Sequence, residues 1–113
     1  MLDVLLELCR QNAERPGIVR LFTILAAESV DSDHPAHAWF VDRYALRRKQ
    51  LARRLAEEQR EGHVAAGIDP DKTAGHILAM FDGLQIQWLL DPEGTDMVGL
   101  FEDFLSRLAP PPA

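Results

Sequence analysis

The chain has 113 residues, of which 47% are hydrophobic and 27% are charged, a composition typical of one globular domain. Its net charge of −6 argues against nucleic-acid binding by this chain, because contacts to phosphates need clustered Lys and Arg. The single cysteine, Cys9, excludes an internal disulfide bond and fits a reducing cytoplasm. No segment approaches the roughly 18 apolar residues of a membrane span, so we expect a cytoplasmic protein without membrane contact.

Helical periodicity of apolar residues runs through most of the chain, and strand patterns are scarce. We expect helices over residues 2–13, 16–30, 36–61, 70–90 and 96–108. Pro16, Pro35 and Pro70 each suit the first turn of a helix, and short loops favour antiparallel neighbours. The sequence therefore predicts an all-α antiparallel bundle of five helices over residues 1–108. The Pro-rich segment 109–113 cannot form helix and is expected to be a disordered tail.

Residues 77–92, ILAMFDGLQIQWLLDP, are apolar on two sides when they are wound as a helix. One stripe is bulky and the other, which passes through Gly83, is mostly small. A helix that is apolar nearly all round must be covered on both sides, and the last helix also has a very wide apolar face. We therefore expect a homodimer through the last two helices, although central burial of both within a monomer is an alternative. The expected interface residues are Gly75, Ala79, Gly83, Ile86, Leu90, Met97, Phe101 and Phe104.

Three pieces of the sequence carry a family resemblance: AAES together with HPAH, the helix entry GHVAAGIDPDK, and DGLQIQWLLDP. They resemble the C-terminal effector-binding and dimerisation domain of TetR/AcrR-family transcriptional repressors, closest to the BetI-type branch. The resemblance covers nearly the whole chain. It implies a small-molecule pocket and dimerisation through the last two helices. It also implies an N-terminal helix-turn-helix domain, which this chain lacks, so we expect a fragment that contacts DNA only through that absent domain.

A pocket in a helical bundle is lined mainly by apolar and aromatic groups, with a few polar groups for orientation. Each apolar candidate is individually as well explained as plain core. The candidates that face inward on the second, third and fourth helices are Phe22, Leu25, Ser29, His37, Phe40, Tyr44, Arg48, Phe81, Gln85 and Trp88.

The polar candidates have competing interpretations. A buried Gln85 amide must find partners, so it either orients a ligand or bridges helices. Arg48 can meet a ligand carboxylate, but pairing with an acid or extension to water is favoured. Asp82 is interpreted first as a surface carboxylate or a partner for an Arg of the third helix. The sharper hypothesis makes it a cation-recognising group beside Trp88 and Tyr44.

Other site types receive less support from the sequence. His34, His37 and neighbouring acids have weak metal-site spacing, and capping of a helix explains the same residues. The segment from Arg43 to Arg60 holds seven basic and two acidic residues, a pattern typical of a solvated helix face. Phosphate-loop, nucleophile-elbow and HExxH motifs are absent, so we expect neither an enzyme nor a cofactor.

The expected function is sensing of a small, mostly apolar effector that controls DNA binding by the missing domain. The rival hypothesis is a stand-alone dimeric interaction module with a filled core and no ligand.

Overall fold

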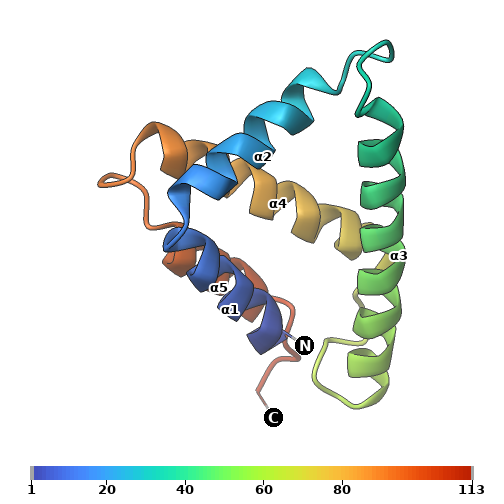
Figure 1. Cartoon of the computed structure of the whole chain (residues 1–113). Coiled ribbons are helices and arrows are strands. Elements are labelled where there is room, and N and C mark those ends of the chain that lie inside the picture. Colours follow the sequence, from blue (N-terminus) through green and yellow to red (C-terminus); the bar gives the residue numbers. More distant parts are fainter. Residues whose placement is uncertain (1, 113) are drawn as a thin grey trace.

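The computed structural model describes residues 2–112, which form five α-helices and no strand (Figure 1). The helices are α1 (Leu2–Ala13), α2 (Pro16–Glu28), α3 (His37–Arg60), α4 (Pro70–Leu90) and α5 (Met97–Ser106). The predicted all-α fold is thus confirmed, and each helix ends within a turn of its expected position. Residues 1 and 113, which belong to the expected domain and tail, lie outside the described residues.

Local sequence explains where the helices begin and end. Pro70 occupies the first turn of α4, and the carboxylate of Asp69 accepts hydrogen bonds from the backbone N–H groups of Asp71 and Lys72. Asp96 caps α5 in the same way by accepting from the N–H of Gly99. At the other end of α3, Gly62 has a φ of 82°, a left-handed conformation that stops the helix and favours glycine.

Helix α4 lies at the centre of the chain and packs against α2, α3 and α5, while α1 packs against α5 and α2 (Figure 1). The core gathers where α1, α3, α4 and α5 meet. Its most deeply buried large side chains are Leu55, Ile77 and Phe101, together with Cys9 from α1. Burial raises the pKa of the Cys9 thiol to about 11, so the group is a neutral core residue.

The molecule is flat. Its Cα atoms extend over 48 × 33 × 17 Å, with a radius of gyration of 15.1 Å. A compact domain of this length has a radius of gyration of about 13 Å. The flat shape leaves several large apolar side chains uncovered, including Leu21 on α2 and Leu90 on α4. Within residues 2–112, no helix combines the length and apolar character needed to cross a membrane.

Truncation of Leu55 tests the core. Leu55 is 0% exposed, so Leu55→Ala should lower the free energy of unfolding by about 2–5 kcal/mol. Leu46 lies on the same helix and is 49% exposed, so Leu46→Ala should change it by less than about 1 kcal/mol. Urea unfolding at one fixed protein concentration measures both. Equal losses in the two variants would contradict the described packing of α3.

Candidate ligand-binding site

A cavity of about 250 Å³ lies among α1, α2, α3 and α4. Four of the residues predicted for a pocket line it: Phe22 from α2, Tyr44 from α3, and Phe81 and Gln85 from α4. In Figure 1, α2 and α3 diverge from the loop that joins them, and α4 runs across the space between them. Asp82, which the sequence suggested as a cation-recognising group, also lines it. The further lining residues, which the sequence did not single out for a pocket, are Leu8, Asn12, Ile18, Val19, Arg43, Arg47 and Leu78.

The aromatic walls of the cavity are held by the core behind them. Phe22 packs edge-to-face on Phe40, with ring centroids 5.3 Å apart. Phe81 packs in the same manner on the fully buried Phe101, also at 5.3 Å. Such contacts fix ring orientation and add to the stability gained by burial. Phe40 therefore supports the cavity from behind without lining it.

A hydrogen bond from Tyr44 to Asp82 joins α3 to α4 at the edge of the cavity. The Tyr44 hydroxyl donates to Oδ2 of Asp82 over 2.5 Å. Burial raises the pKa of Asp82, and this effect exceeds the opposing effects of the hydrogen bond and of the Arg47 charge. Burial and the neighbouring carboxyl group also raise the pKa of Tyr44. Asp82 thus does pair with α3, but through a tyrosine hydroxyl instead of the expected arginine.

Gln85 is the most informative polar residue in the cavity. It is only 4% exposed, yet its side-chain amide makes no hydrogen bond with any residue of the described chain. The amide atoms are not sealed from solvent, since Nε of Arg43 is the one fully buried side-chain polar atom without a partner among the described residues. The amide is therefore available to hydrogen-bond a molecule that enters the cavity. Of the two interpretations of Gln85, bridging between helices therefore has no contact to support it.

Two arginines that the sequence analysis overlooked line the cavity from α3. Arg43 is half-buried, and its Nε atom is buried without a hydrogen-bond partner in the described structure. Its guanidinium carbon lies 5.6 Å from the ring centroid of Trp39. Partial burial, followed by the charge of Arg43, lowers the pKa of Arg47. Arg48, the residue that was predicted, is exposed and lies outside the cavity.

The remaining predicted residues do not line the cavity. Ser29 and His37 hold the loop between α2 and α3, where Nδ1–H of His37 donates to the Ser29 carbonyl over 2.8 Å. Leu25 is exposed on another side of α2. Trp88 lines a separate hollow of about 330 Å³ with Pro16, Arg20 and others. Helical spacing predicted inward positions for these side chains. It could not predict whether each would lie at the cavity, at the loop between α2 and α3, or at another part of the surface.

Comparison with known families gives one match. The model of the BetI-type transcriptional repressor C-terminal domain matches residues 1–110. The chain belongs to this family. The resemblance seen in the sequence is thereby confirmed, and the chain is a regulatory domain of transcriptional repressors. Comparison with curated proteins and with solved structures finds no match.

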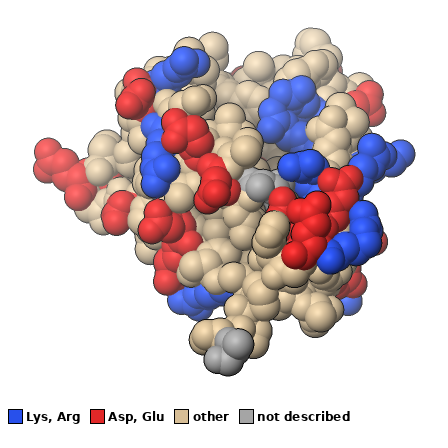
Figure 2. Space-filling view, turned by 90° about the horizontal axis from the view of Figure 1, so that it is seen from below, with Lys and Arg blue, Asp and Glu red and all other residues tan. Residues whose placement is uncertain are grey.

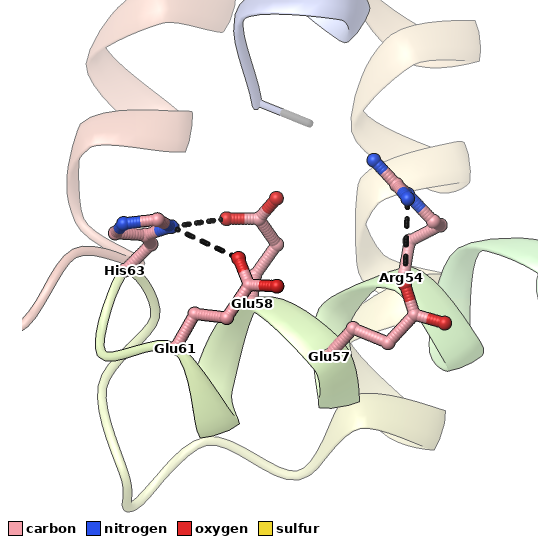
Figure 3. Close-up of polar contacts among 5 residues, drawn as sticks. All are labelled: Arg54, Glu57, Glu58, Glu61 and His63. Atoms are coloured by element: carbon pink, nitrogen blue, oxygen red, sulfur yellow. Dashed lines mark hydrogen bonds and ion pairs between the residues drawn. The ribbon is translucent and has the colours of Figure 1, made fainter.

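The BetI-type domain also gathers a histidine and two glutamates where α3 ends (Figure 3). Nδ1 of His63 lies 2.8 Å from Oε2 of Glu58 and 3.6 Å from Oε2 of Glu61. The hydrogen bond to His63 lowers the pKa of Glu58. His63 and Glu61 are exposed, so ion pairing at a helix end accounts for the group. The earlier metal candidates are engaged too, since His34 Nδ1 accepts from the Ala36 N–H over 3.1 Å.

The basic run of α3 behaves as a solvated helix face. Arg48, Lys49 and Arg53 are exposed, and the guanidinium of Arg54 pairs with Glu57 over 3.3 Å (Figure 3). On the face of the domain shown in Figure 2, basic and acidic side chains are interspersed. Such mixing provides no continuous basic patch on this face for a phosphate backbone.

The pKa shift of Asp82 predicts the effect of pH on stability. A raised folded-state pKa favours folding below the ordinary pKa of Asp, about 3.9, and this contribution is lost as pH rises through the folded-state value. Asp82→Asn keeps an acceptor for Tyr44 without the charge. It should raise the melting temperature at pH 7, and the difference from the parent should vanish below about pH 3.9.

Melting curves followed by circular dichroism between pH 3 and pH 8 measure this difference. Asp42→Asn, at an exposed position of α3, controls for the removal of one negative charge. A lower melting temperature for Asp82→Asn at pH 7 would show that the ionised carboxylate stabilises the fold, and would contradict the prediction.

Proposed function

We propose that the chain is the effector-sensing and dimerisation domain of a TetR-type repressor, and that a small ligand binds in the cavity among α1, α2, α3 and α4. One observation carries this proposal. Gln85 is buried, has no partner in the described chain, and lines a cavity with firmly supported aromatic walls. A ligand in the cavity can hydrogen-bond this amide, which would fix the ligand's orientation against the aromatic walls.

The cavity joins elements that are far apart in the sequence. Tyr44 of α3 and Gln85 of α4 meet residues of α1, namely Leu8 and Asn12. A ligand in the cavity contacts all three helices at once. It shifts the domain toward one arrangement only if it binds that arrangement more tightly than the other. In this proposal α1, the helix nearest the N-terminal side, transmits the shift to the DNA-binding domain.

Replacement of Gln85 tests the ligand site. Small-molecule fragments that raise the melting temperature of the parent should bind Gln85→Met about tenfold more weakly, because the thioether has a similar length but lacks the amide's hydrogen bonds. Gln87→Met, at an exposed position of the same helix, should bind them as the parent does. A thermal-shift screen followed by calorimetry measures both. The absence of any stabilising fragment would favour the rival interaction module.

We further propose that the domain forms a homodimer through the exposed stripe of α4. Ile86 and Leu90 on this stripe are 47% and 81% exposed. Apart from the local backbone of α4, no atom of the described residues lies within 4 Å of a Cβ built at Gly75 or Gly83, so another backbone has room to approach. A second copy would cover this face and thicken the flat molecule.

Helix α5 contributes less to this proposed interface than the sequence analysis expected. Met97 and Phe101 belong to the chain's own core, where Phe101 is 0% exposed, and Phe104 is half-buried. Leu100 is exposed on the same helix. The proposed interface therefore keeps Gly75, Ala79, Gly83, Ile86 and Leu90 from α4, with Leu100 and the exposed part of Phe104 from α5.

A large charged side chain at Gly83 tests the interface. Gly83→Arg should weaken dimerisation by at least about 30-fold, because the guanidinium would lie in the contact. The monomer should still fold, since the space beside Gly83 is open within the chain. Gly67→Arg, in the loop before α4, makes the same change elsewhere and should leave the dimer intact. Sedimentation equilibrium measures both, and an unchanged dimer in Gly83→Arg would refute the interface.

A further inference from the structure

The charged groups of the cavity do not balance. Arg43 and Arg47 bring two positive charges from successive turns of α3, and Asp82 brings the one negative charge among the lining residues. If Asp82 is ionised, the lining carries one excess positive charge, and if Asp82 is protonated, it carries two. The excess is positive in either state, so the lining favours an anionic ligand.

Neither guanidinium forms an ion pair with the described residues, although the charge of Asp82 acts on Arg47 from a longer distance. No carboxylate of residues 2–112 lies within 4.0 Å of the guanidinium nitrogens of Arg43 or Arg47. The Nε atom of Arg43 is buried with no acceptor from the described residues. The two charges also oppose each other, since Arg43 lowers the pKa of Arg47. An anion placed between them would accept hydrogen bonds from both side chains and remove this repulsion.

The rest of the cavity is mostly apolar. Phe22, Leu78 and Phe81 line it together with Val19 and Ile18, while the neutral polar groups come from Asn12, Tyr44 and Gln85. Its volume of about 250 Å³ lies just below the range of about 300–1,000 Å³ that is usual for drug-sized ligands. The site therefore suits a small molecule with one anionic end and a compact apolar body.

We propose that the effector of this domain is a small monocarboxylate, with its carboxylate bound by Arg43 and Arg47 and its apolar body against Phe22 and Phe81. This inference rests on the proposed function, since it names the ligand class of the same cavity. Guanidinium groups match a carboxylate because they can donate two parallel hydrogen bonds to it. Asp82 accepts the hydrogen bond of Tyr44, and in its ionised state it repels an anion and so favours placement of the anion at the arginines.

Three probes of equal chain length test the charge preference. Octanoate, octanamide and octylammonium share an apolar body and differ in the charge of the polar end. Calorimetry on the full chain at pH 7 should show octanoate binding at least about tenfold more tightly than octanamide, with octylammonium the weakest. Arg43→Gln and Arg47→Gln should each remove this preference while octanamide binding stays unchanged.

Arg48→Gln is the matched control, because it removes the same charge from an exposed position of α3 outside the cavity. It should leave the preference for octanoate intact. Arg47 is itself exposed, so Arg47→Gln should fold. Its preference between octanoate and octanamide can therefore be measured even if Arg43→Gln does not fold.

Three outcomes would overturn the inference. Tighter binding of octylammonium would assign recognition to Asp82, and equal binding of all three probes would show selection by the apolar body alone. Both leave the proposed function standing. Binding of none of the three would also refute a carboxylate effector, and the fragment screen with Gln85→Met then decides separately whether the cavity binds any ligand.

Discussion

Covering helix α4 is the constraint on which the rest of the structure depends. This helix is apolar over most of its circumference, so no single neighbour can remove it from water. Helices α3, α5 and α2 cover three of its sides, and the core residues Ile77 and Leu84 lie within that cover. The side with Gly75 and Gly83 is left open. The flat shape follows from this arrangement.

The cavity is a place where the chain departs from close packing. Protein interiors are usually filled as densely as organic crystals, and buried polar groups are usually paired. Here Nε of Arg43 is buried without a partner among the described residues, and Arg43 lines the cavity together with Gln85, whose amide makes no hydrogen bond within them. The unpaired Nε reduces the stability of the domain. Departures of this kind gather at functional sites, because a ligand can supply the missing partners.

The helices were predictable because each has a local cause in the sequence. Pro70 with its capping Asp69, and Asp96 before the last helix, mark helix starts whose structure is confirmed. The wide apolar face of α5 was equally clear in the sequence. Its width alone does not show which of its residues pack on the chain's own core. Met97 and Phe101 face that core, whereas Leu100 is the large apolar residue of α5 that stays exposed.

The cavity was predictable in part for a related reason. Arg47 and Arg48 lie on opposite sides of the line through Tyr44 and Leu51, roughly equally far from it at 3.6 residues per turn. The wheel of α3 alone cannot distinguish them. Arg47 lines the cavity and Arg48 does not, because α1, α2 and α4 enclose the cavity on the side of α3 that carries Arg47. The periodicity of one helix does not predict where the neighbouring helices lie.

The burial of Cys9 makes α1 an element whose movement can be followed chemically. The thiol is 1% exposed and neutral near pH 7, so reagents that attack thiolates cannot reach it while α1 is docked on the core. It is the only cysteine of the chain, so every labelled molecule has been labelled at this one position. The rate at which Cys9 is labelled therefore measures how often α1 separates from the core. The same thiol would therefore report, in a repressor bound to its effector, whether the ligand holds this helix in place or releases it.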